Sequence, residues 1–69
     1  MKQYVYTYQM ILIEGYSKKS KKYLYGKNSQ NIIVIVPNVY DIGKIVKIYI
    51  YACSNTVLFG FKINKLNHK

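Results

Sequence analysis

The stretch Val46-Lys47-Ile48-Tyr49-Ile50-Tyr51-Ala52 alternates apolar side chains with lysine or tyrosine. Successive side chains of a β-strand point to opposite faces, so this pattern predicts a strand whose aliphatic residues enter a core. Lys47, Tyr49 and Tyr51 would then face outward. The alternation is the clearest in the molecule, and it indicates an all-β fold.

Four further segments favour strands, because β-branched and aromatic residues dominate each of them. The first covers residues 4–13, with Tyr4, Tyr6 and Tyr8 on one face, and the Glu14-Gly15 step ends it. Pro37 stops the third strand, since proline cannot donate to a ladder. The remaining predicted strands are residues 22–27, 32–36 and 57–63, separated by polar connections at residues 16–22, 28–31, 38–43 and 53–56.

The number and spacing of these strands predict the architecture. The chain has 69 residues, and an apolar pattern at helical spacing never lasts beyond a turn or two. Five short strands favour a small five-stranded OB-like barrel, because closure hides the edges of the sheet. We expect an N-terminal strand extension at residues 1–10, the barrel at residues 11–63 and a basic tail at residues 64–69.

The charge of the chain points to an anionic partner. Eleven lysines face only Glu14 and Asp41, which gives a formal net charge of +9 at pH 7. So large a surplus on a small body attracts polyanions, and nucleic acid is the default partner. Abundant Lys, Asn, Ile and Tyr, with no Arg or Trp, leave compositional bias as a second explanation, although bias does not account for the scarcity of acids.

Residues able to carry catalysis or bind a metal are too few and too scattered. Cys53 is the only cysteine and His68 the only histidine, and Glu14 and Asp41 lie far apart in the sequence. We therefore expect no disulfide, no metal site, no cofactor and no enzymatic activity, with Cys53 reduced at a strand end. No run of apolar residues approaches the roughly 20 that span a membrane, so we expect a soluble intracellular protein of the cytoplasm or an organelle matrix.

Ordered motifs along residues 11–63 resemble a known family. They are Ile11-Leu12-Ile13-Glu14-Gly15, Leu24-Tyr25-Gly26-Lys27, Val34-Ile35-Val36-Pro37, Ile42-Gly43-Lys44-Ile45-Val46-Lys47-Ile48 and Ser54-Asn55-Thr56-Val57-Leu58-Phe59-Gly60. In this order the motifs resemble the TRAM domain, found at the C-terminus of tRNA methylthiotransferases and in tRNA and rRNA uracil methyltransferases. The resemblance implies an OB-like barrel that grips tRNA or rRNA for a catalytic domain, or that binds RNA alone.

Two kinds of side chain are expected to bind this RNA. Lysines of the 16–22 loop and of the sheet would contact phosphates, the alternative being a solvated surface. Outward tyrosines and a phenylalanine would stack on unpaired bases, the alternative being packing on protein or on lysine stems. The candidates are Lys18, Lys19, Lys21, Lys22, Tyr23, Tyr25, Lys27, Lys44, Lys47, Tyr49, Tyr51, Phe59 and Lys62.

Two departures from the family pattern bear on partners. Residues 32–36 are apolar on both faces, where the family alternates, so a catalytic domain or ribonucleoprotein neighbours would cover the outer face. Lys27 stands where the family often has arginine, which leaves a point charge instead of a bidentate fork. Tyr4, Tyr6 and Tyr8 could form a protein contact.

Three functions stay open from the sequence. The first is RNA binding through lysine and aromatic side chains. The second is a structural subunit of a ribosome or another ribonucleoprotein, with an OB-like fold. The third is the targeting domain of an RNA-modifying enzyme. A membrane-surface role is the weakest reading, because no amphipathic helix is predicted.

Overall fold

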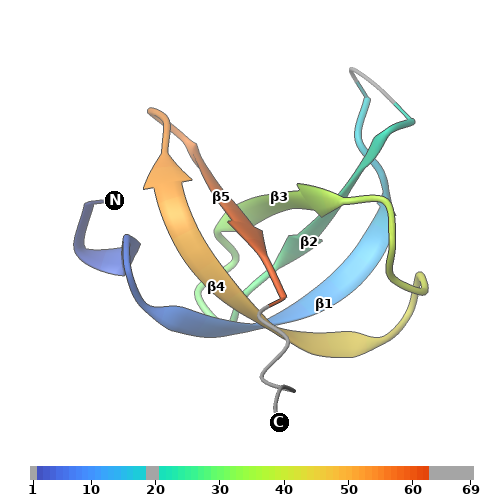
Figure 1. Ribbon diagram of the computed structural model, residues 1–69, viewed down its shortest axis with the longest axis horizontal. Helices are drawn as coiled ribbons and strands as arrows, with labels where there is room; N and C mark the ends of the chain where they lie inside the picture. The colour runs from blue at the N-terminus through green and yellow to red at the C-terminus, as the bar shows by residue number, and fades with distance from the viewer. Residues whose placement is uncertain (1, 19–20, 63–69) are drawn as a thin grey trace, which may run out of the picture.

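A computed structural model describes residues 2–18 and 21–62, which form a closed five-stranded barrel (Figure 1). A short 3-10 helix, η1, precedes the strands at Lys2–Tyr4. The strands are β1 (Tyr8–Tyr16), β2 (Tyr23–Lys27), β3 (Ile33–Pro37), β4 (Ile45–Cys53) and β5 (Val57–Phe61). The predicted all-β fold with five strands in a small barrel is confirmed.

The order of strands around the barrel is β1-β2-β3-β5-β4, and β4 pairs with β1 to close it. All neighbouring strands are antiparallel except β3 and β5, which run parallel. In a ring of five strands, β3 lies opposite the seam between β4 and β1. The outer surface of β3 and that of the seam therefore face in opposite directions.

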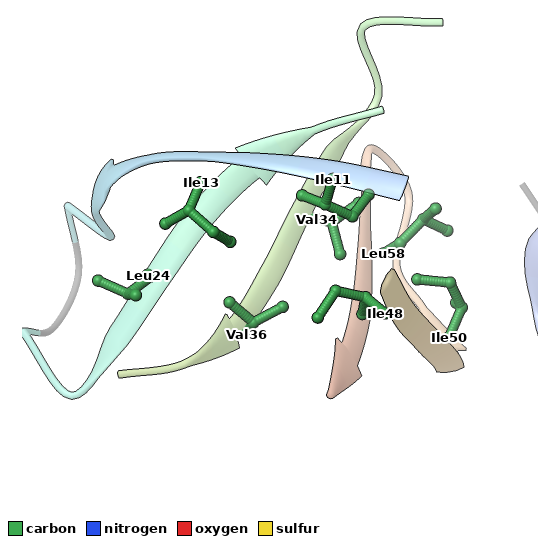
Figure 2. Packing of buried hydrophobic residues seen from close by; sticks show 8 residues of the cluster. All are labelled: Ile11, Ile13, Leu24, Val34, Val36, Ile48, Ile50 and Leu58. Atoms are coloured by element: carbon green, nitrogen blue, oxygen red, sulfur yellow. The ribbon is translucent and has the colours of Figure 1, made fainter. Parts of the chain in front are cut away.

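Among the residues that the structure describes, eight aliphatic side chains pack in the interior, and each is at most 1% exposed (Figure 2). Every strand contributes to this cluster through alternate residues, as a pleated strand requires. Ile48 and Ile50 of β4 are among them and Val46 packs against the cluster, so the inward orientation predicted for these three residues is confirmed. The buried residues are Ile11, Ile13, Leu24, Val34, Val36, Ile48, Ile50 and Leu58.

Two inward positions are occupied by glycine because neighbouring strands leave no room for a side chain. A Cβ atom at Gly26 would overlap the carbonyl oxygen of Leu12 and lie 2.5 Å from Cγ2 of Ile11. At Gly60, a Cβ atom would lie 2.6 Å from the carbonyl oxygen of Tyr49. In both cases the obstacle includes backbone, so moving a side chain could not relieve it.

The N-terminal strand begins later than predicted. Residues 2–4 are helical, and Tyr6 adopts a positive φ of 70°, which breaks the expected alternation of Tyr4, Tyr6 and Tyr8. The segment is held instead by β4, because the Tyr6 N–H donates to the Ile50 carbonyl at 2.7 Å and the Ile50 N–H donates to the Thr7 carbonyl at 2.9 Å. The strand prediction for residues 4–7 was therefore wrong.

The same strand also ends later than predicted. The Glu14-Gly15 step does not terminate β1, which continues to Tyr16. Pairing with β2 shifts register between Ile13 and Gly15, as a β-bulge does, and resumes with Gly15 opposite Tyr25. The bulge lets β1 bend while it stays in the sheet, a feature that hydrophobic alternation alone does not reveal.

The other boundaries agree with the sequence to within about a residue where the structure describes them. Pro37 is the last residue of β3, and Cys53 is the last residue of β4. β5 ends at Phe61, and Ile63 and the tail at residues 64–69 lie outside the described residues. The division of the chain at residues 10 and 63 stays a prediction.

The turn predicted at residues 28–31 is built on a buried asparagine. Asn28 is only 7% exposed, and its Oδ1 atom accepts from the N–H groups of Gln30 at 2.9 Å and Ile32 at 3.0 Å. Asn31 adopts a φ of 63°, a left-handed conformation that asparagine tolerates. The side chain of Asn28 thus fixes the connection between β2 and β3.

Replacing Gly26 or Gly60 with alanine should destabilise the barrel, because the new methyl group collides with backbone. Overpacking of this kind costs about 1–3 kcal/mol, and each 1 kcal/mol should lower Tm by about 4–8 °C in a chain of this size. Thermal and urea unfolding, followed by circular dichroism, measure the effect. Gly15→Ala is the control, since its Cβ would lie 3.4 Å from Cε1 of Tyr25. Equal stability of all three variants would contradict the close approach.

Candidate nucleic-acid interface

The outward side chains of β2, β3 and β5 form one continuous face. Tyr25 on β2 lies opposite Ile35 on β3, and Ile35 lies opposite Phe59 on β5. Lys27 lies opposite Ile33, two residues further along the same two strands. Residues that lie opposite each other on neighbouring strands share a face of the sheet. Tyr25 and Phe59, both predicted to stack on bases, therefore lie on either side of Ile35. Lys27, predicted to contact phosphate, lies on the same face.

Two adjoining hollows lie over this face and share Ser17 and Lys18 from the β1–β2 connection; together they are termed the groove. In Figure 1, the β1–β2 and β4–β5 hairpins stand on either side of β3 at the top of the view. The larger hollow, about 600 Å³, is lined by Ser17, Lys18, Tyr23, Ile35, Tyr51, Val57 and Phe59. The smaller, about 320 Å³, is lined by Ser17, Lys18, Tyr25, Lys27 and Ile33.

The groove brings together six of the residues proposed from the sequence, counted among the described residues 2–18 and 21–62. They come from three separate elements and the β1–β2 connection, and they comprise two lysines and four aromatic residues. Neither Glu14 nor Asp41 lines the groove itself, although Glu14 lines a neighbouring hollow together with Lys27. The six are Lys18, Tyr23, Tyr25, Lys27, Tyr51 and Phe59.

The β1–β2 connection is anchored at its base by backbone and side-chain hydrogen bonds. The Ser17 N–H donates to the Tyr23 carbonyl at 2.9 Å. Asn38, just after β3, donates from Nδ2 to the Lys21 carbonyl at 2.9 Å and from its N–H to the Lys22 carbonyl at 3.0 Å. Lys21 and Lys22 are exposed in this turn, whereas Lys19 lies outside the described residues.

Tyr49 and Lys47 lie outside the groove, on the side of the barrel formed by β4 and β1. The ring centroids of Tyr49 and Tyr8 are 5.1 Å apart, and Nζ of Lys47 lies 5.1 Å from the centroid of the Tyr8 ring. Phe61 is within 6.3 Å of Tyr49 and 5.3 Å of Tyr51, centroid to centroid. The sequence did not predict that Tyr8 and Phe61 contact the rings of Tyr49 and Tyr51, because only the register between the strands places these rings together.

Lys44 and Lys62 meet in a third hollow, of about 310 Å³, which is separate from the groove. The N–H of Lys62 donates to Oη of Tyr40 at 2.6 Å, so the end of β5 is tied to the connection before β4. Asp41 lines the same hollow and offsets part of the lysine charge. The lysine positions predicted from the sequence are therefore divided among different surfaces.

The most exposed apolar face is on the β1–β4 seam and not on β3. Leu12 lies opposite Ile45 in the ladder, and Leu12, Ile45 and Met10 are 42%, 64% and 57% exposed. On β3, Ile33 is 36% exposed, while Ile35 is half-buried and lines the groove. Coverage of residues 32–36 by a partner stays a prediction.

Within residues 2–18 and 21–62, no group of three or more His, Cys, Asp or Glu side chains could hold a metal ion. Over the same ranges, none of the helical structure is long and apolar enough to cross a membrane. The side chains that line the groove carry ammonium groups, aromatic rings, hydroxyls and aliphatic groups.

Comparison with known proteins gives a single family. A family model described as the TRAM domain matches residues 2–63, and TRAM domains are nucleic-acid-binding modules. A tRNA-2-methylthio-N(6)-dimethylallyladenosine synthase of Karelsulcia muelleri is 43% identical over 60 residues, which cover 86% of this chain and 13% of that protein. Proteins of the same name from Parabacteroides distasonis and Azobacteroides pseudotrichonymphae are 43% and 47% identical over 51 residues, 72% of this chain. The chain spans only 11% to 13% of the length of these curated relatives.

Asn38→Ala should loosen the lysine-bearing connection without unfolding the barrel. The variant loses the hydrogen bond to the Lys21 carbonyl, and a net loss of about 0.5–1.5 kcal/mol would make local opening roughly two-fold to ten-fold more frequent. Limited trypsin digestion measures cleavage after Lys18, Lys21 and Lys22 by mass spectrometry. Asn55→Ala, in the exposed β4–β5 turn, should leave the rates unchanged. Identical cleavage of both variants would show that Asn38 does not anchor the connection.

Proposed function

The chain belongs to the TRAM domain family, and on this premise we propose that it binds RNA through the groove, with lysines contacting phosphates and aromatic rings stacking on bases. The observation that carries the proposal is the convergence of Lys18 and Lys27 with Tyr23, Tyr25 and Phe59 around one concave surface. A positively charged groove with aromatic platforms is the arrangement that binds nucleic-acid strands with little sequence preference.

The chemistry of the cations supports recognition of backbone and not of base sequence. The groove cations are lysines, and an ammonium group is a compact point charge that contacts phosphate without the bidentate geometry of a guanidinium. Each ring offers a face to any unpaired base. Selectivity would then come from the shape of the RNA, as expected for a module that grips a structured RNA.

The names of the relatives support tRNA as the RNA, with rRNA as the second choice. The matched relatives are named as tRNA-modifying synthases, and this chain corresponds to a small part of each. In this proposal the chain holds tRNA in the cytoplasm or an organelle matrix, while a catalytic polypeptide carries out any modification. Its own contribution is binding, because its groove carries no acid–base pair among the described residues.

A structural role in a ribonucleoprotein is the second candidate, and one observation favours it. Met10, Leu12 and Ile45 form an exposed apolar surface on the seam opposite β3, which would suit a protein neighbour. The two functions differ in isolation. A structural subunit should associate or aggregate without its neighbours, whereas an RNA-binding module should be a monomer that binds tRNA, as size-exclusion chromatography with light scattering can show.

Removing groove lysines should weaken tRNA binding more than removing the same charge elsewhere. The groove double variant carries Lys18→Gln and Lys27→Gln, and the control double variant carries Lys44→Gln and Lys62→Gln. Both lower the net charge by the same amount. Binding of labelled tRNA is measured across a salt series. The wild-type chain should bind with a steep salt dependence. In the groove double variant, the slope of log K against log salt concentration should fall in magnitude by roughly 1.4–1.8, since each phosphate contact contributes about 0.7–0.9.

The control double variant separates position from net charge. If Lys44 and Lys62 do not contact RNA, this variant should retain most of the slope. Equal weakening by both pairs would show that the whole surface acts as a diffuse positive field. Absence of tRNA binding by the folded wild-type chain at low salt would overturn the proposed function.

A further inference from the structure

Four aromatic rings form a continuous series across the outer surfaces of β1, β4 and β5. The series runs from Tyr8 to Tyr49 at 5.1 Å, from Tyr49 to Phe61 at 6.3 Å and from Phe61 to Tyr51 at 5.3 Å, all between ring centroids. These four residues are termed the ring ladder. Its last member, Tyr51, also lines the groove, so the ladder leads into the groove.

The ladder keeps aromatic surface open to a ligand. Tyr8, Tyr51 and Phe61 are 45%, 48% and 40% exposed. Their planes are tilted from their neighbours by 36° to 60°, so no two rings stack face to face. Cross-strand contact between rings stabilises a sheet, but it would not by itself require three of four rings to remain so exposed to water.

The exposed ring faces select for unpaired bases. The centroids of adjacent rings lie 5.1 Å to 6.3 Å apart, which is too close for a base to enter between two rings, so each base would stack on the exposed face of one ring. The faces of paired bases are covered within a helix, so only an unpaired strand can present them to aromatic side chains.

Cations lie at both ends of this path. At one end, Nζ of Lys47 lies over one face of the Tyr8 ring, 5.1 Å from its centroid, and at the other end Lys18 lines the same hollow as Tyr51. A strand whose bases lie on the rings would place phosphates alongside these ammonium groups. Charge and aromatic surface thus follow one track from the β1–β4 side of the barrel to β3.

We propose that the ring ladder binds an unpaired segment of the RNA, with bases stacking on Tyr8, Phe61 and Tyr51, and that the strand continues into the groove. The inference rests on the proposed function and names the class of ligand, a single-stranded stretch of several nucleotides. OB-type barrels bind about 4–16 nucleotides, a length that spans both parts of the track.

The test uses the full chain and three probes: oligouridine RNAs of 4 and 12 nucleotides and a 12-base-pair RNA duplex. Tyr8→Leu and Phe61→Leu remove rings while keeping apolar contact. Each should weaken binding of the 12-nucleotide strand by about five-fold to 150-fold, the loss expected for one stacked base, and should leave duplex binding within about two-fold of wild type. Tyr16→Leu is the control, because Tyr16 is 51% exposed on β1 but outside the ladder and the groove.

A second measurement does not depend on the folding of any variant. Titration of the wild-type chain with the 12-nucleotide strand should shift the NMR ring-proton signals of Tyr8 and Phe61, because a stacked base adds a ring current. The 4-nucleotide strand should bind more weakly than the longer strand, since it cannot occupy the whole track.

The outcomes separate this inference from the proposed function. If Phe59→Leu in the groove weakens the 12-nucleotide strand while Tyr8→Leu and Phe61→Leu do not, the ladder is refuted and groove binding stands. Equal losses for duplex and single strand would refute the assignment of an unpaired ligand. No binding of tRNA or of any probe by the wild-type chain would overturn both proposals.

Discussion

Close approach of the strands at Gly26 and Gly60 is the constraint on which the barrel depends. At both positions the backbone of a neighbouring strand occupies the space that a side chain would need. The interior is consequently small, and among residues 2–18 and 21–62 the fully buried side chains are aliphatic. The aromatic residues must find places elsewhere, chiefly on the outer surface, where cross-strand pairing brings them together.

Because the interior is narrow, the aromatic side chains lie mainly on the outer surface of the barrel. Tyr25, Ile35 and Phe59 share a face because β2, β3 and β5 are neighbours in the closed ring. The bulge in β1 extends the strand to Tyr16, so Ser17 and Lys18 reach over that face and complete the groove. A flat sheet of the same strands would leave the face open, without the lysine connection beside the aromatic residues.

The sequence predicts most of the fold because the core follows simple alternation. Ile48 and Ile50 could be assigned to the interior from the period of two, and the breaks at Asn28 and Pro37 delimit β2 and β3. Alternation failed at the N-terminus because the left-handed backbone of Tyr6 changes the direction of the chain. It also failed at Gly15, where a bulge lets the strand continue.

The candidate site was predictable in composition but not in arrangement. Lysine and tyrosine residues of these segments were predicted to contact RNA, yet the separation of Lys44 and Lys62 from the groove depends on barrel closure. The pairing of Tyr8 with Tyr49 depends on the register of β1 against β4, two strands far apart in the sequence. Period-two patterns specify which way a side chain points, whereas its neighbour on the next strand is set by turns and bulges.

Closure also brings the two kinds of surface together across β2. Lys27 lines the smaller hollow of the groove, and it also lines a hollow with Met10, Leu12, Glu14 and Ile45. In the ladder, Leu12 lies opposite Lys27, and Lys27 lies opposite Ile33. The exposed apolar surface of β1 and β4 therefore meets one edge of the groove at Lys27, although β3 itself lies across the barrel from the seam between β1 and β4.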